Sequence, residues 1–156
     1  MAPDASGLRA LLGLVDEDEA TRRLAREGGH AFVSSSLRPF MVAALAEIDS
    51  AAQSRPTLVV VGDDRAARDM AADLRAWLQP RRVRYYPSRG VAYESHLAPP
   101  PHLVGLRVAA LDALLTAQAS ERDRSGVGQP VVVVSAAALS EKVPDRRCGR
   151  ARSCFG

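Results

Sequence analysis

Lysine is nearly absent from this chain of 156 residues, and aromatic side chains make up only 4% of it. Lys142 is the single lysine, and codon usage in a GC-rich genome explains why almost every basic residue is arginine. With so few aromatic rings, alanine, leucine and valine must supply most of the core packing. No apolar run approaches the roughly 20 residues of a membrane-spanning helix, so we expect no membrane partner.

Cysteine is also scarce, and both copies, Cys148 and Cys154, lie near the carboxyl end. Two thiols without a neighbouring histidine cannot complete the four ligands of a structural zinc site. A disulfide framework needs a secretory context, and the apolar stretch at residues 8–15 makes a poor signal peptide because Arg9 interrupts it. We therefore expect a cytoplasmic protein with reduced cysteines.

The net charge of +3 is unevenly distributed. Residues 146–156 hold four arginines and no acid, so the rest of the chain carries +3 − 4 = −1. A nearly neutral body does not favour a basic groove that follows a phosphate backbone.

Strand and helix patterns alternate along the chain. Short segments of strand length predict strands at residues 30–34, 57–61, 83–86 and 131–134; residues 57–61 are a continuous apolar run and 131–134 are β-branched. Helical patterns cover residues 5–27, a segment capped by Ser35 or Ser36, residues 63–78, a segment with a stripe from Leu103 to Leu114, and a short turn at 136–141. This alternation predicts an α/β fold with a mostly parallel sheet and flanking helices. The continuous apolar run at 57–61 is typical of a strand buried on both faces.

The phosphate-binding motifs common in α/β folds are missing from the sequence. A P-loop requires GxxxxGK[ST] after the first strand, but residues 33–39 read VSSSLRP. The run at 131–134 leads into Ser135, where such ATPases place a metal-binding acid. The patterns GxGxxG and GxSxG are absent as well. Gly62, Asp63 and Asp64 follow a strand, where a tight turn with a helix cap is favoured over a metal or phosphate site. We expect no catalytic, cofactor or metal site in this chain.

The segment 84–115, RYYPSRGVAYESHLAPPPHLVGLRVAALDALL, is the most informative part of the sequence. Four prolines restrict the loop within it, so we expect a defined surface. His96 and His102 have no matched nucleophile, which favours a polar loop over a catalytic base or ligand. The candidate interaction surface consists of Tyr85, Tyr86, Arg89, Tyr93, Glu94, His96 and His102. The alternative is internal packing, with the three tyrosines covering the carboxyl ends of the strands.

This segment resembles the N-terminal region of bacterial transcription-repair coupling factors (Mfd). The later block VVVVSAAALSEKVPD, residues 131–145, looks like the strand and turn that follow there, and residues 55–77 extend the likeness. The resemblance covers roughly residues 5–145 and implies a UvrB-like module with a degenerate P-loop, helicase-like fold resembling domain 1a of UvrB.

In that family the complete protein is an ATP-dependent DNA translocase that removes stalled RNA polymerase and recruits UvrA for nucleotide excision repair. The resemblance implies that the partners UvrA, RNA polymerase and double-stranded DNA, together with ATP and magnesium, belong mainly to domains outside the matched region. The chain itself is then a non-catalytic interaction module at residues 1–145. The alternatives are a stand-alone small α/β nucleotide-binding protein or enzyme, and a fragment of a UvrB-type ATPase.

The family pattern ends at the tail DRRCGRARSCFG, whose composition resembles GC-rich DNA read in another frame. We interpret residues 146–156 as an aberrant basic tail from a frameshift or truncation. A real basic peptide that binds nucleic acid is the alternative.

Overall fold

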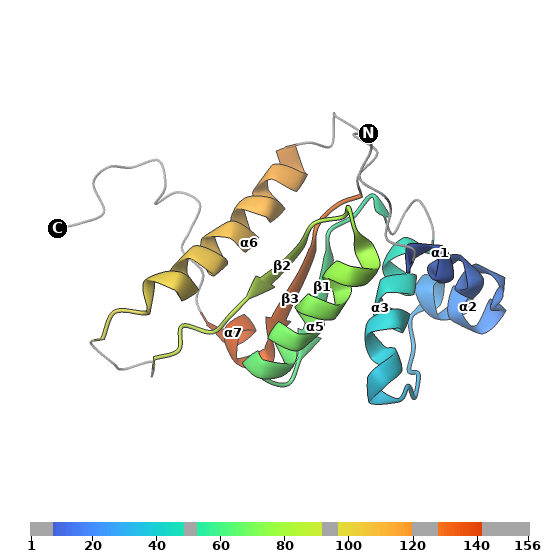
Figure 1. Cartoon of the computed structure of the whole chain (residues 1–156), viewed down its shortest axis with the longest axis horizontal. Helices are drawn as coiled ribbons and strands as arrows, with labels where there is room; N and C mark the ends of the chain where they lie inside the picture. Colours follow the sequence, from blue (N-terminus) through green and yellow to red (C-terminus); the bar gives the residue numbers. More distant parts are fainter. Residues whose placement is uncertain (1–7, 49–52, 92–96, 120–127, 142–156) are drawn as a thin grey trace.

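The computed structural model describes residues 8–48, 53–91, 97–119 and 128–141. Within these ranges the fold is α/β, with a three-stranded parallel sheet flanked by helices (Figure 1). The strands are β1 (Thr57–Val61), β2 (Val83–Tyr86) and β3 (Val131–Ser135), in the order β1-β3-β2. In this part of the chain, no helix combines the length and apolar character needed to cross a membrane.

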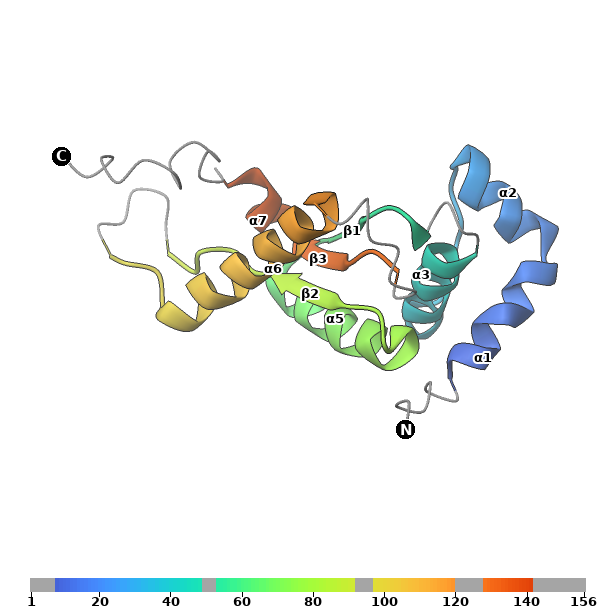
Figure 2. The same cartoon turned by 90° about the horizontal axis from the view of Figure 1, so that it is seen from above.

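Helices lie on both faces of the sheet, and further helices lie beyond its β1 edge (Figures 1 and 2). α5 (Asp64–Leu78) packs on one face, while α6 (Pro101–Ala119) and α7 (Ala136–Ser140) lie on the other. α3 (Arg38–Glu47) packs against α5 beside β1. α1 (Arg9–Leu12) and α2 (Glu19–Glu27) lie outside α3, with 3₁₀ turns at Gly13–Glu17 and Ser35–Leu37.

Local sequence explains where several helices begin and end. Asp18 caps α2 by accepting a hydrogen bond from the Thr21 amide at 3.1 Å, and this cap divides the predicted N-terminal helical region in two. Gly28 ends α2 with a positive φ of 73°, a conformation that glycine adopts without steric cost. Pro39 lies in the first turn of α3, where its missing N–H has no helical partner to lose.

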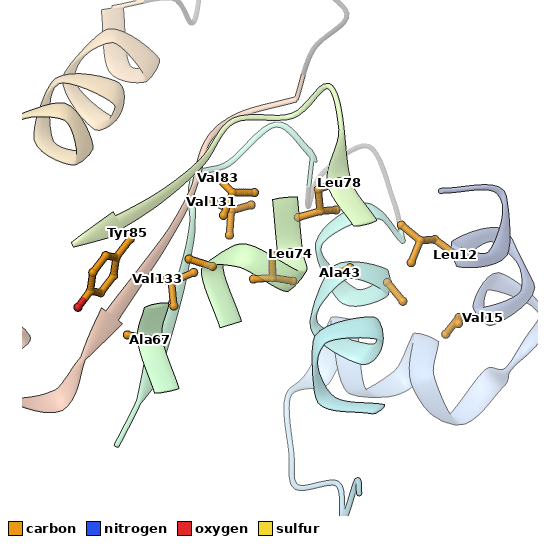
Figure 3. Packing of buried hydrophobic residues seen from close by; sticks show 12 residues of the cluster. Leu12, Val15, Ala43, Ala67, Leu74, Leu78, Val83, Tyr85, Val131 and Val133 are labelled. Atoms are coloured by element: carbon orange, nitrogen blue, oxygen red, sulfur yellow. The ribbon is translucent and has the colours of Figure 1, made fainter. Parts of the chain in front are cut away.

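The main core lies between the sheet, α5 and α3 (Figure 3). Leu74 and Leu78 of α5 are fully buried against Val131 and Val133 of the central strand. Phe40 and Trp77 meet edge to face beside them, with ring centroids 5.2 Å apart. A smaller core on the opposite face joins Tyr86, Val132 and Val134 to Ala110 of α6 and Ala138 of α7. Small aliphatic side chains thus provide most of the packing, as the low aromatic content predicts.

Two strand predictions are wrong. Residues 30–34 form no strand, and the ring of Phe32 in this segment is fully exposed. β1 has the predicted bounds, but it is an edge strand with one open face, and Leu58 and Val60 are 54% and 49% exposed there. The physical reason is that α6 lies over β2 on this face and leaves the side chains of β1 uncovered.

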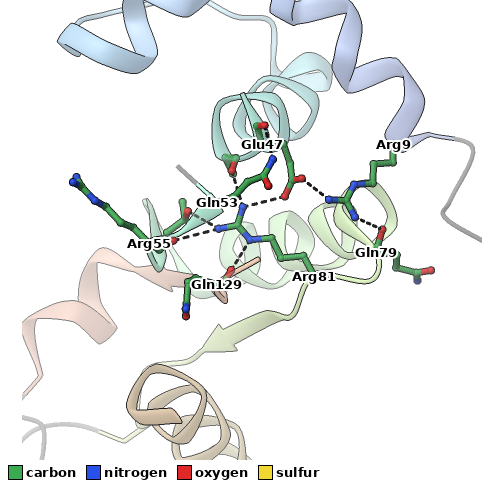
Figure 4. A network of polar contacts seen from close by, with 9 residues as sticks. Arg9, Glu47, Gln53, Arg55, Gln79, Arg81 and Gln129 are labelled. Atoms are coloured by element: carbon green, nitrogen blue, oxygen red, sulfur yellow. Dashed lines mark hydrogen bonds and ion pairs between the residues drawn. The ribbon is translucent and has the colours of Figure 1, made fainter. Parts of the chain in front are cut away.

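A buried arginine holds the amino end of the sheet to α3 (Figure 4). The Arg81 residue is only 4% exposed. Its guanidinium donates to the Ala46 carbonyl at 2.7 Å and to Glu47 Oε1 at 3.1 Å. It also donates to the carbonyls of Arg55 and Gln129 and to the Thr57 hydroxyl. Because the acceptors lie in α3, in β1 and in the loops before β1 and β3, one side chain joins segments distant in sequence.

Candidate functional site

The carboxyl ends of the three parallel strands meet at one edge of the sheet, where open α/β folds usually bind ligands. Asp64 follows β1 and opens α5, Ser88 follows β2, and Ser135 ends β3. These three polar residues come from widely separated parts of the sequence. The parallel pairing brings them together.

Asp64 accepts most of the hydrogen bonds that join the strand ends at this edge. Ser135 Oγ donates to Asp64 Oδ1 at 2.6 Å, and the Ser88 amide donates to the same oxygen at 3.2 Å. The Ser88 hydroxyl donates to the other carboxylate oxygen, Oδ2. The Tyr85 hydroxyl adds a bond to the backbone carbonyl of Asp64 at 3.1 Å. We call Asp64, Ser88 and Ser135 the strand-end network, because together they join the ends of all three strands.

The charge of Asp64 is stabilised by these contacts. Partial burial alone would raise the pKa of this carboxyl, but the bonds from Ser135 and Ser88 and the positive charge of Arg68 outweigh burial and hold the pKa below its ordinary value. Burial and the nearby Asp64 charge raise the pKa of Tyr85, with Arg68 opposing them. At neutral pH this edge of the sheet therefore contains the Asp64 carboxylate, which accepts bonds, and the neutral Tyr85 phenol, which donates one.

The two helices that begin at this edge are capped by their own side chains. Asp63 accepts a bond from the Ala66 amide at 2.8 Å at the start of α5, which agrees with the predicted turn and helix cap. Ser135 Oγ accepts from the Ala138 amide at 3.1 Å at the start of α7. These caps occupy N–H groups that would otherwise be available to an anion.

A second cluster lies next to the strand-end network, around Arg107 of α6. Arg107 Nη1 donates to Glu141 Oε2 at 2.6 Å and to the Pro87 carbonyl at 2.8 Å. Its guanidinium stacks over the Tyr86 ring at 4.3 Å from the centroid. The Arg89 amide donates to Glu141 Oε1 at 2.9 Å, so the segment after β2 is joined to both α6 and the end of α7.

The predicted interaction surface is divided by the structure. Tyr85 and Tyr86 are each only 6% exposed, as in the internal-packing alternative, and their rings offer little area to a partner. Arg89 is half-buried and lies against Glu141, whereas His102 is exposed in the first turn of α6. Tyr93, Glu94 and His96 lie outside the described residues, as do the tail 146–156 and both cysteines.

Sequence reasoning missed the serines of the strand-end network and the Arg107–Glu141 pair. Ser135 had a usable signal, since a polar residue directly after a buried valine run marks the carboxyl end of a strand. Arg107 and Glu141 are 34 residues apart and had no local signal. Within the described ranges, no group of three or more histidine, cysteine, aspartate or glutamate residues could hold a metal ion.

Comparison of the chain with protein-family models, with curated proteins and with solved structures gives no match in any of the three.

Proposed function

We propose that this chain is a non-catalytic interaction module corresponding to the N-terminal, UvrB-like region of a transcription-repair coupling factor. The observation that carries the proposal is the strand-end network. At the edge where related architectures bind nucleotides, Ser88 and Ser135 both donate hydrogen bonds to the Asp64 carboxylate. A cluster whose polar groups are satisfied internally favours a structural role over ligand turnover.

The sequence likeness supplies the family. In the structure, the block from Arg84 to Leu115 includes the end of β2 and most of α6, and the valine-rich block forms β3 and α7. Under the proposal, the fold is the degenerate P-loop, helicase-like module of that family. ATP and magnesium serve its translocase domains, and UvrA, RNA polymerase and double-stranded DNA are partners of the complete protein.

A chimera tests the proposal. Residues 1–145 would replace the matching N-terminal region of a well-behaved coupling factor, and ATP hydrolysis without RNA polymerase would be compared with that of a version lacking the region. In the family this module helps to restrain the protein before it meets polymerase, so the chimera should hydrolyse ATP slowly and the deleted version faster. An unrelated α/β domain of similar size in the same place is the control. A chimera as active as the deleted version would contradict the proposal.

The alternative, a stand-alone nucleotide-binding protein or enzyme, places the Asp64 carboxylate at a ligand site. Titration calorimetry of the whole chain with ATP plus magnesium, and with NAD, distinguishes the two. Heat of binding that disappears in Asp64→Asn would favour the alternative. We expect no saturable heat with either ligand.

A further inference from the structure

A cavity of about 710 Å³ lies beside the outer edge of β1. Val59, Val60 and Val61 of β1 line one side of it, and Met41 and Leu45 of α3 line another. The segment at residues 31–33 and the exposed face of α5 complete the lining. This volume lies within the range of roughly 300–1,000 Å³ that is typical of pockets for drug-sized ligands. We call this cavity, together with the outer edge of β1, the β1 groove.

The edge of β1 that faces the groove carries unpaired backbone groups. The Thr57 amide donates to the Pro130 carbonyl at 3.0 Å, just before β3. The backbone N–H and C=O groups of alternate residues in a strand point to the same neighbouring strand. Those of Thr57, Val59 and Val61 therefore point toward β3. Leu58 and Val60 direct theirs to the other side, where no strand of the described residues lies. Such groups are a template for one more strand.

This geometry selects the chemical class of the occupant. A helix already uses its backbone groups internally and could not satisfy the N–H and C=O of Leu58 and Val60. An apolar small molecule would fill the cavity and leave the same groups unpaired. An extended polypeptide satisfies both requirements, since its backbone pairs with β1 while alternate side chains enter the cavity and cover Leu58 and Val60.

The charges around the groove add a further preference. Asp69 and Asp73 of α5 are one helical turn apart, exposed, and part of the cavity lining. Arg38 is the basic residue among the lining side chains, so the lining carries a net charge of −1. This charge disfavours nucleic acid and favours a strand that places an arginine or lysine near α5.

From these observations we propose that the β1 groove binds an extended, largely apolar peptide strand with a basic residue, contributed by another polypeptide, by β-strand addition to β1. This inference does not depend on the function proposed above. It concerns the outer edge of β1, whereas that proposal depends on the strand-end network.

The probe is a dye-labelled eight-residue peptide of alternating valine and threonine with an arginine at one end. Binding to the whole chain is followed by fluorescence anisotropy, and amide hydrogen exchange of the isotope-labelled chain locates it. We expect saturable binding and slower exchange at the amides of Leu58 and Val60. The same peptide with N-methylated backbone amides should lose at least about tenfold in affinity, because it cannot complete the ladder.

Two sets of variants separate pairing from folding. Val60→Pro removes the outward N–H and should weaken binding at least about tenfold, while an edge strand tolerates proline at such a position. Val60→Thr keeps the N–H and the branched shape, and should bind as the unchanged chain does. Replacing Asp69 and Asp73 together by arginine should reverse the preference from the arginine peptide to a matched glutamate peptide. Thermal unfolding of each variant verifies that the fold is retained.

Each remaining outcome overturns the proposal. Absence of peptide binding, or binding that leaves the exchange of Leu58 and Val60 unchanged, excludes strand addition at β1. Protection of these amides that grows with protein concentration, without peptide, identifies a second copy as the occupant. Protection without peptide at every concentration assigns the edge to a segment of the chain itself. Equal affinity for the arginine and glutamate peptides overturns the proposed occupant, because a basic residue that pairs with the charge of α5 is part of it.

Discussion

Two buried or half-buried charges, Arg81 and Asp64, hold opposite ends of the sheet. At the amino end, Arg81 donates to acceptors in α3, in β1 and in the loops before β1 and β3. At the carboxyl end, the Asp64 carboxylate accepts bonds from the segments after β2 and at the end of β3. Breaking such an arrangement from one side leaves the other groups buried without partners, which costs more than the bond itself contributes.

Arg81→Met therefore removes the shared donor of several acceptors while keeping an unbranched apolar side chain. Because Glu47 and the Ala46 carbonyl lose this partner, we expect a loss of about 3–5 kcal/mol in the free energy of unfolding. Denaturant titration measures it. The matched control is Arg82→Met at the exposed neighbouring position, which should change stability by less than about 0.5 kcal/mol. Equal effects at both positions would show that the hydrogen bonds of the Arg81 side chain are not important for stability.

Asp64→Asn tests the strand-end network through its dependence on pH. The folded-state pKa of Asp64 lies below its ordinary value of 3.8, so ionisation stabilises the fold fully above that pH, and the contribution is lost as pH falls through the lowered pKa. We expect the variant to be less stable at pH 7 by about 1–2 kcal/mol, since bonds to a charged group are lost at a partly exposed site. The difference should shrink in denaturant titrations below pH 3.8. The control is Asp63→Asn, which keeps a good helix cap and should change the free energy of unfolding little at any pH. If the loss of stability in Asp64→Asn stays constant with pH, the charge of Asp64 is not its cause.

At the scale of elements, local pattern predicts the type of segment well and its neighbours poorly. The bounds of β1 and β2 follow from apolar runs between turn residues, and Asp63 marks the start of α5 as a cap. The segment at 30–34 has a similar local pattern but forms no strand, because strand formation needs a neighbour to pair with. The open face of β1 depends on where α6 lies, which periodicity does not encode. The side-chain partners of Arg81 are 24 to 48 residues away in the sequence, so these hydrogen bonds could not be predicted either.

Two glycines, Gly90 after β2 and Gly105 within α6, should respond in opposite directions to substitution by alanine. Gly90 has a φ of +70°, and an added Cβ would lie 2.9 Å from Leu103 Cδ1, so Gly90→Ala introduces backbone strain and a clash. We expect it to lower stability by about 1–2 kcal/mol. Gly105 lies inside α6 with open space around it, so Gly105→Ala should raise stability by about 0.5–1 kcal/mol. Thermal and denaturant unfolding measure both; a stabilising Gly90→Ala would contradict the positive φ at this residue.

On the scale of the whole molecule, the described residues form a sheet that is well covered on one face and partly open on the other. Leu58 and Val60 on β1, and Val104, Val108 and Leu115 on α6, are exposed apolar side chains on this part of the molecule. Monomeric proteins rarely leave apolar side chains such as Leu58 and Val60 on an edge strand without a charge to prevent association. The arrangement suits a module that works against another polypeptide surface.

Leu58→Lys places a charge on this open face, beside the outer edge of β1. The side chain is 54% exposed, so we expect the free energy of unfolding to change by less than about 0.5 kcal/mol. Self-association through this open face should fall, because a lysine there interrupts the exposed apolar patch. Light scattering over a rising concentration series measures this. The matched control is Val59→Lys at the next residue, whose side chain packs toward the main core and whose replacement should destabilise the fold. If Leu58→Lys associates as readily as the unchanged chain, the open face of β1 is not a surface through which copies meet, and the exposed side chains of α6 become the next to test.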